Sequence, residues 1–244
     1  MSNQTRTALV TGCNGDVGRF LAGHLLESGW RVLGLDRADR EPPPGVIFER
    51  CDLRDAAATS GAVERLATAH GAPDLVVNGA GIIANAPLVT IAATGGWQAH
   101  DAALWEDVIG SGLTSAFHVI AASVPRMLTA RKRGVIVNIS SVCAAGNPGQ
   151  VAYSAAKAGL NGLTYALAKE LGPLGIRVVG LAPGYLDTAS TRDHVTAARL
   201  AKVVAGVPLR RLGSLEDLTR ALDFIVADGY VNGTIIELDG GLVL

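Results

Sequence analysis

The sequence predicts an α/β protein with one doubly wound parallel sheet and helices on both faces of that sheet. Short apolar runs alternate along the chain with longer segments of helical periodicity, which is the pattern of βαβ units. Right-handed crossovers then place the helices on both sides of the sheet. No linker, low-complexity run or internal repeat interrupts residues 1–244, so we expect a single domain.

Seven apolar runs are predicted to be buried strands, because each is short and bounded by turn residues. The predicted strands are residues 7–10, 31–35, 46–48, 75–77, 135–139, 177–181 and 234–238. The segments between them carry apolar residues three or four positions apart, which is typical of amphipathic helices. The predicted helices are residues 17–28, 55–70, 102–130, 151–172 and one or two within 184–227, whereas 82–101 is expected to be irregular.

The composition narrows the class of protein. Of 244 residues, 49% are hydrophobic and 18% are charged, which provides a sizeable core and excludes a disordered chain. A formal net charge of −1 lacks the basic field of a nucleic-acid-binding protein. We expect no membrane helix, since no apolar run approaches about 20 residues, and no metal site, since the five histidines lack ligand spacing. Three widely spaced cysteines and no signal-peptide segment indicate free thiols in a cytoplasmic protein.

A ligand of such a sheet binds beyond the carboxyl ends of the strands. The first strand ends there in a glycine-rich turn with the spacing Gly-x-x-Gly-x-x-Gly, and this turn opens a helix. Glycines let the backbone approach a pyrophosphate, whose charge is met by free N–H groups of the helix. The alternative is a turn that needs positive φ for its own geometry. The candidate cofactor residues of this turn are Gly12, Asn14, Gly15, Asp16, Val17 and Gly18.

The second strand ends at Asp36, 24 residues after Gly12. A carboxylate at this place accepts hydrogen bonds from both ribose hydroxyls of NAD and repels the 2′-phosphate of NADP. The neighbouring Arg37 could pair with that phosphate, but no Lys or Arg lies between Thr11 and Gly18 to assist it. We therefore expect NAD rather than NADP. The alternative is an ordinary solvated strand end.

A serine, a tyrosine and a lysine form the candidate catalytic group. Tyr153 and Lys157 are four residues apart on a predicted helix and so share one face, and Ser141 follows the end of a strand. A nearby ammonium lowers the pKa of a phenol, which would make Tyr153 a proton donor or acceptor near neutral pH. A second pair, Tyr165 and Lys169, lies more than three turns from the strand ends, and we interpret it as structural. The alternative for Tyr153 is a packed core aromatic.

Together these residues resemble the short-chain dehydrogenase/reductase family, over nearly the whole chain from Thr11 to Gly241. The resemblance implies a Rossmann fold and hydride transfer between a nicotinamide and a secondary alcohol or ketone. It makes Tyr153 the general acid/base and Ser141 the group that orients the substrate oxygen. Lys157 would bind the nicotinamide ribose and lower the pKa of the tyrosine.

The resemblance also implies further cofactor contacts. Asp52 and Leu53 would border the adenine. The segment after the fourth predicted strand would line the cofactor through Asn78, Gly79, Ala80 and Gly81. The segment after the sixth would hold the nicotinamide end through Pro183, Gly184, Leu186 and Thr188.

Several positions depart from the family pattern. The glycine spacing is that of the family's longer branch, and Asp16 stands where the short branch has glycine. Asp16 could help to cap the helix. Gly112 aligns with the usual catalytic asparagine, so a relay through that residue would use the main chain only. Motif register selects Ser141 as the catalytic serine, whereas the common distance to the tyrosine selects Ser140, and we favour Ser141.

Two segments are expected to form substrate or lid loops, namely 82–104 and 184–210. The first is longer than the family usually has, and it could equally be a surface or subunit-contact insertion. Ile82, Trp97 and Tyr185, together with Leu186, would make an apolar substrate pocket. Relatives of this type are often tetramers, so we expect a homo-oligomer, either a tetramer or a dimer.

Four hypotheses follow. The leading one is an NAD-dependent dehydrogenase or ketone reductase for a small or medium apolar secondary alcohol. The second is a 3-oxoacyl reductase for an acyl carrier or CoA thioester, which would favour NADPH and want basic residues near the pocket mouth. The third is a sugar-nucleotide epimerase or dehydratase, for which the chain is too short. The fourth is a cofactor-binding regulatory protein with weak or no turnover, motivated by Gly112.

Overall fold

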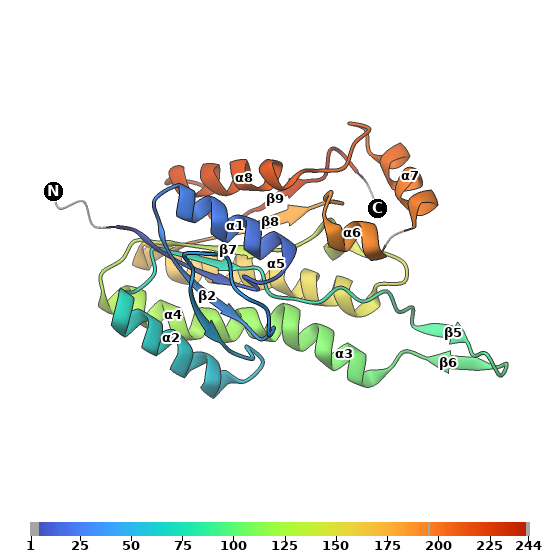
Figure 1. Ribbon diagram of the computed structural model, residues 1–244, viewed down its shortest axis with the longest axis horizontal. Coiled ribbons are helices and arrows are strands. Elements are labelled where there is room, and N and C mark those ends of the chain that lie inside the picture. The colour runs from blue at the N-terminus through green and yellow to red at the C-terminus, as the bar shows by residue number, and fades with distance from the viewer. Residues whose placement is uncertain (1–4, 195, 243–244) are drawn as a thin grey trace.

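A computed structural model describes residues 5–194 and 196–242, and it confirms a single α/β domain around a parallel sheet of seven strands (Figure 1). The order across the sheet is β3-β2-β1-β4-β7-β8-β9. The strands are β1 (Thr7–Thr11), β2 (Arg31–Asp36), β3 (Ile47–Arg50), β4 (Leu75–Asn78), β7 (Val135–Ile139), β8 (Arg177–Pro183) and β9 (Ile235–Leu238). The chain builds outward from β1 to β3 and then resumes on the other side of β1 with β4. This reversal between β1 and β4 opens a crevice at the carboxyl ends of these strands.

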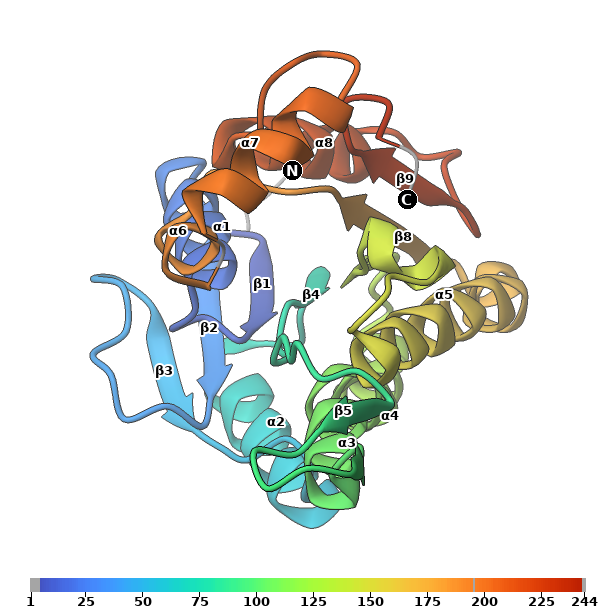
Figure 2. The same cartoon turned by 90° about the vertical axis from the view of Figure 1, so that its right-hand side faces the viewer.

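Helices cover both faces, as predicted (Figure 2). On one face, α1 (Asp16–Glu27) and α8 (Leu215–Ala227) pack Leu21, Leu25 and Leu222 into one apolar core. On the other face, α2 (Ala56–His70), α4 (Ser115–Thr129) and α5 (Val151–Leu171) form a second core. Successive strand residues alternate between the two cores, since side chains along a strand point to opposite faces.

The predicted helix 102–130 consists of α3 (Ala102–Ile109), a π-helical turn at Gly110–Thr114 and α4. By length and a mean hydropathy of 1.4, Ala102–Thr129 could span a membrane, which corrects the sequence expectation that no segment qualifies. In this fold 44% of its most apolar window is buried, and it packs against α2 and α5. Its apolar character is thus explained by the second core.

The segment expected to be irregular contains an antiparallel hairpin of β5 (Val89–Ile91) and β6 (Trp97–Ala99). The hairpin projects away from the body of the protein at the end where the sheet strands end (Figure 1). Gly95 and Gly96, with φ of +86° and +88°, make its turn. Apolar residues alternate with polar ones on both sides of this glycine pair, which is a hairpin signal in the sequence.

Between β8 and α8 the chain forms α6 (Ala189–His194) and α7 (Ala197–Gly206). Both helices lie at the carboxyl end of the sheet (Figure 2), and Thr191 of α6 and Arg199 of α7 line a cavity there. The predicted lid segment is therefore helical in part.

Candidate active site

A cleft runs along the carboxyl ends of the strands. It consists of two adjoining cavities of about 580 Å³ and 480 Å³ that share Gly12, Gly15, Gly79, Gly81 and Ile82 in their walls. The larger cavity extends to the ends of β2 and β3, and the smaller one extends to α5 and the lid. All of the sequence-predicted site residues except Asn78 and Trp97 line this cleft.

The glycine turn after β1 brings the start of α1 to the cleft. A Cβ atom on Gly12, whose φ is +67°, would lie 2.8 Å from the backbone nitrogen of Ala80, and one on Gly18 would lie 2.1 Å from the carbonyl oxygen of Gly12. These two glycines are therefore required by the turn itself. Gly15 is exposed and is the N-cap residue of α1, where it has no side chain to fill the space before the helix. Such a helix end, open to the cleft, can receive a pyrophosphate.

Asp16 is the first residue of α1, and the N-cap position is occupied by Gly15. Its carboxylate lies in the first turn, where the helix macrodipole favours negative charge.

Asp36 is held at the end of β2 by two backbone N–H groups. Asn14 N donates to one carboxylate oxygen at 3.0 Å and Ala38 N donates to the other at 2.8 Å. The side chain of Arg40 donates to the carbonyl oxygen of Asn14 at 3.2 Å. The carboxylate of Asp36 is thus fixed in the wall of the larger cavity, where it can accept hydroxyl groups of a ribose.

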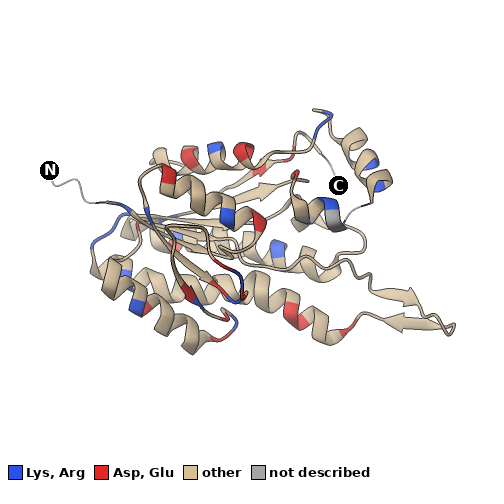
Figure 3. Cartoon of the chain, in the orientation of Figure 1, with Lys and Arg blue, Asp and Glu red and all other residues tan. Residues whose placement is uncertain are grey.

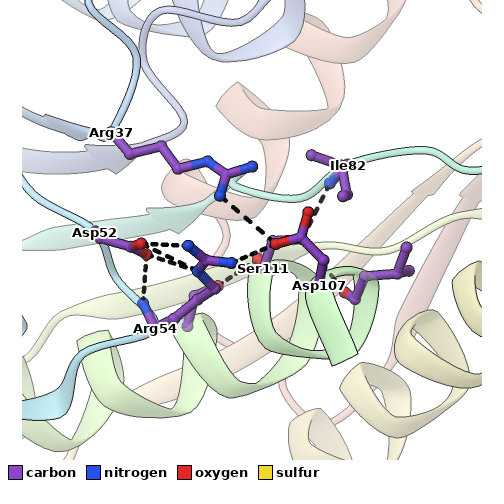
Figure 4. Close-up of polar contacts among 8 residues, drawn as sticks. Arg37, Asp52, Arg54, Ile82, Asp107 and Ser111 are labelled. Atoms are coloured by element: carbon purple, nitrogen blue, oxygen red, sulfur yellow. Dashed lines mark hydrogen bonds and ion pairs between the residues drawn. The ribbon is translucent and has the colours of Figure 1, made fainter. Parts of the chain in front are cut away.

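Arginines also surround this end of the cleft, and carboxylates pair with two of them (Figure 4). Arg37 lies 3.6 Å from Asp107 on α3, and Arg54 contacts both Asp52 and Asp107. The Arg54 guanidinium lowers the pKa of Asp52 to about 2. Two of these residues, Arg54 and Asp107, were not predicted. Arg54 could have been found from its place two residues after Asp52, whereas Asp107 approaches only through the fold.

The candidate catalytic residues meet in the smaller cavity. Lys157 is buried, and its Nζ donates to the carbonyl oxygen of Ile139 at 2.6 Å. The same Nζ lies 5.6 Å from the centre of the Tyr153 ring. Ser141 accepts a hydrogen bond from Cys143 N at 3.2 Å, and its side chain acts to lower the pKa of the Tyr153 phenol, against the larger effect of burial.

The two neighbouring serines have different partners. The hydroxyl of Ser140 donates to the Asn161 side chain of α5 at 2.5 Å. It therefore ties β7 to α5, whereas Ser141 is the serine that reaches Tyr153. The second pair, Tyr165 and Lys169, is exposed on α5 and does not line the cleft, in agreement with its structural interpretation.

Burial controls the electrostatics of the tyrosine and the lysine. It raises the pKa of Tyr153 above the usual value near 10, against a smaller effect of the Ser141 hydrogen bond in the other direction. It also lowers the pKa of Lys157 to about 8. The expectation of a lowered pKa for the phenol is therefore wrong for the protein chain alone, because desolvation by burial is the largest cause of the pKa shift of both groups.

Gly112 lies in the π-helical turn, a kind of irregularity that is frequent at functional sites. A Cβ atom on Gly112 would lie 3.3 Å from the Cβ of Ala156, and one on Gly81 would lie 3.4 Å from the Cα of Gly112. The turn thus packs closely against α5 and against the segment after β4. The Ser111 side chain is 3.4 Å from the backbone nitrogen of Ile82 and supports the same contact (Figure 4).

Two residues were misplaced by the sequence. Asn78 is buried, and its side chain donates to Asn138 at 2.9 Å, which links β4 to β7 beneath the cleft. Trp97 lies on the hairpin with 78% of its surface exposed, so it does not join Ile82, Tyr185 and Leu186 in the pocket. Asn78 is still part of β4, where its side chain pairs with the neighbouring strand, and Trp97 is part of β6 in the projecting hairpin.

The pocket has further walls that the sequence did not indicate. These cavity-lining residues are Ile83, Asn85, Val142, Cys143, Gln150, Thr191 and Arg199. Gln150 donates to Asn85 at 2.8 Å, which joins the loop before α5 to the root of the hairpin. No sequence motif marks these positions, because their meeting depends on how the loops cross.

Comparisons with known proteins agree with this geometry. Residues 6–198 match the short chain dehydrogenase family. Proteins named 3-oxoacyl-[acyl-carrier-protein] reductase FabG are similar over the full length: the one from Pseudomonas aeruginosa is 34% identical over 100% of both chains. The one from Thermotoga maritima is 33% identical over 100% of both chains, and that of Staphylococcus aureus is 32% identical over 98% of this chain and 99% of its own. This chain therefore belongs to the short-chain dehydrogenase family and is an oxidoreductase that acts on hydroxyl or keto groups with a nicotinamide cofactor.

Proposed function

We propose that this protein is an NAD-dependent dehydrogenase or reductase for an apolar secondary alcohol or ketone. The observation that carries the proposal is the meeting of Ser141, Tyr153 and Lys157 in the wall of a cleft that continues to Asp36. Proton-transfer groups and a carboxylate suited to a ribose thus share one elongated site.

The residues present fit a dinucleotide. Gly12 and Gly18 leave no side chain between the turn and its neighbours, and Gly15 opens the N-terminus of α1 to the cleft. When bound, the nicotinamide supplies or accepts the hydride. Gly184 and Thr188 would border that end, and Lys157 would contact its ribose.

Side chains of the protein donate and accept the proton. Because burial raises the pKa of Tyr153, the phenol is protonated at neutral pH and can donate to a carbonyl oxygen during reduction. Ser141, which lines the same cavity as the phenol, would orient the same oxygen. In the oxidative direction the phenolate of Tyr153 would take the proton from the hydroxyl group of the alcohol.

NAD is proposed over NADP because of the charges at the far end of the cleft. The Asp36 carboxylate would lie near the position of a 2′-phosphate, while Asp107 and Asp52 compensate Arg37 and Arg54. These arrangements favour a ribose with two free hydroxyls.

An apolar substrate is proposed from the pocket walls. Ile82, Ile83, Val142 and Leu186 supply aliphatic surface beside Tyr153. A 3-oxoacyl thioester is the second candidate, favoured by the names of the relatives. A regulatory protein with weak turnover is the third, favoured by the absence of a side chain at Gly112.

We also propose that the protein is cytoplasmic and forms a homo-oligomer. Cys13, Cys51 and Cys143 are free and buried, as expected in a reducing compartment. Phe117 on α4 and Tyr165 on α5 expose 52% and 45% of their surface, which suits a face covered by another subunit.

The test is Tyr153→Phe, with Tyr165→Phe as the matched control. We expect Tyr153→Phe to lower turnover by a factor of about 100 or more, because the proton donor is lost, with the Kd for NADH unchanged. Tyr165→Phe should retain activity. A screen of aliphatic, aryl and acyl-thioester ketones identifies the substrate class. Equal activity of both variants, or equal loss in both, would contradict the assignment of the catalytic tyrosine.

A further inference from the structure

The β5–β6 hairpin has one apolar face and one polar face. Its register pairs Val89 with Ala99 and Ile91 with Trp97, and these four side chains share one face because they alternate with Thr90 and Gln98. The hairpin extends beyond α3 into solvent (Figure 1). We call this hairpin, residues 88–99, the arm.

Large apolar side chains of the arm are exposed to an unusual degree. The exposed fractions are 66% for Leu88, 51% for Val89, 72% for Ile91 and 78% for Trp97. The sequence from 75 to 100 contains no Asp, Glu, Lys or Arg that would keep such a projection soluble. Contiguous apolar surface of this kind marks an interaction site.

We propose that the apolar face of the arm packs against a second copy of this chain. The root of the arm is continuous with the helical face that we propose as a subunit interface. A bridge between Ala86 and Gln150 places the root beside the start of α5, where Val151 is exposed. From there the exposed side of α5 continues to Tyr165. The inference thus rests on the proposed homo-oligomer, and it adds a segment that reaches from one subunit onto another.

The exposed area of the arm is consistent with an interface formed by the arm together with the faces of α4 and α5. Its four large side chains expose roughly 500 Å² of mostly apolar surface, taking about 150–250 Å² for each large residue. A stable interface buries about 800 Å² on each partner. The arm alone is therefore too small to hold a dimer, but together with the faces of α4 and α5 it is large enough.

The charges near the arm disfavour a lipid surface as the occupant. Two acidic residues follow the arm, namely Asp101 at the N-cap of α3 and Glu106 on α3, and Figure 3 shows no blue segment on the hairpin. Anionic membranes attract segments flanked by Lys and Arg and repel acidic ones. A protein surface is thus the better match.

The arm is also connected to the substrate pocket. Ile82, Ile83 and Asn85 at its root line the smaller cavity, and Asn85 accepts a hydrogen bond from Gln150 at 2.8 Å. A second subunit that packs on the arm would therefore hold the pocket wall at the root of the arm in place. Oligomer formation and substrate affinity should be linked through this wall.

The experiment is Trp97→Ser, with Tyr230→Ser as the control, because Tyr230 is 98% exposed and lies after α8. Sedimentation velocity over a dilution series measures the dissociation constant of the oligomer. We expect Trp97→Ser to raise this constant by about 30-fold or more, the effect of one interface hot spot. Trp97→Phe should keep the dissociation constant close to the wild-type value, and Tyr230→Ser should leave it unchanged. NADH binding and Tm report that each variant is folded.

Three results would overturn the proposal. An oligomer whose dissociation constant is the same in Trp97→Ser would show that the arm lies outside the interface. A monomeric wild-type chain would refute the oligomer as well, while turnover of the same sample would test the proposed activity separately. Wild-type binding to vesicles of phosphatidylcholine and phosphatidylglycerol, lost in Trp97→Ser, would assign the arm to lipid.

Discussion

The preference for NAD over NADP can be tested by removing one charge. Asp36→Asn keeps the size of the side chain and one acceptor oxygen for the backbone N–H groups of Asn14 or Ala38, which lie at 3.0 and 2.8 Å. It removes the negative charge that would oppose a 2′-phosphate. The variant therefore separates the electrostatic contribution of Asp36 from its structural one.

The size of the effect follows from Coulomb's law. Two unit charges about 4 Å apart interact by ~1 kcal/mol in a water-like medium and by ~4 kcal/mol at an effective dielectric constant of about 20. A 2′-phosphate carries a charge of about −2, and Asp36 is only half-buried, so the water-like limit gives ~2 kcal/mol. We expect wild-type protein to bind NADH about 30-fold more tightly than NADPH.

The assay is fluorescence titration of both reduced cofactors at low and at high salt. Asp36→Asn should reduce the preference to about threefold or less, since the charge that opposes the phosphate is gone and Arg40 remains in the cavity wall. High salt should weaken the wild-type preference, because exposed charges are screened. Tighter binding of NADPH by the wild type, or a ratio unchanged in the variant, would refute the reasoning.

Two further predictions concern the buried lysine and the close helix contact. Burial lowers the pKa of Lys157 to about 8, so between pH 8 and about 10 the unfolded chain binds more protons and the cofactor-free protein should gain stability as pH rises, by up to about 3 kcal/mol. Lys157→Met should remove this gain in urea unfolding curves measured at several pH values, and an equal slope in both proteins would contradict it. Gly112→Asn should destabilise the protein by about 1–3 kcal/mol, because its Cβ would lie 3.3 Å from that of Ala156. Ala156→Gly in the same chain should recover part of that loss, whereas an unchanged midpoint for Gly112→Asn would show that the turn can move.

Local sequence patterns predict much of the architecture. Apolar runs such as 135–139, the glycine turn that includes Gly12 and the four-residue spacing of Tyr153 and Lys157 all depend on neighbours within about one helical turn or one strand. Because the carboxyl ends of parallel strands meet at one edge, these patterns were enough to bring nearly all predicted site residues to the same cleft.

The remaining features depend on contacts between distant residues. Asp107 pairs with Arg37 and Arg54 only because α3 crosses the end of the sheet. The hydroxyl of Ser140 is hydrogen-bonded to Asn161, a contact that spacing does not indicate, and we propose Ser141 for the catalytic position. Trp97 lies on the arm because the two strands there pair with each other and not with the sheet.

Local periodicity encodes which backbone state and which face a residue prefers, and it therefore predicted the strands, the helices and the edge where the cleft lies. The burial of a side chain, by contrast, depends on all of the elements that pack around it. Burial raises the pKa of Tyr153 and lowers the pKa of Lys157, and the lack of burial leaves the arm exposed. These properties arise only when the folded chain excludes water from some side chains and leaves others in it.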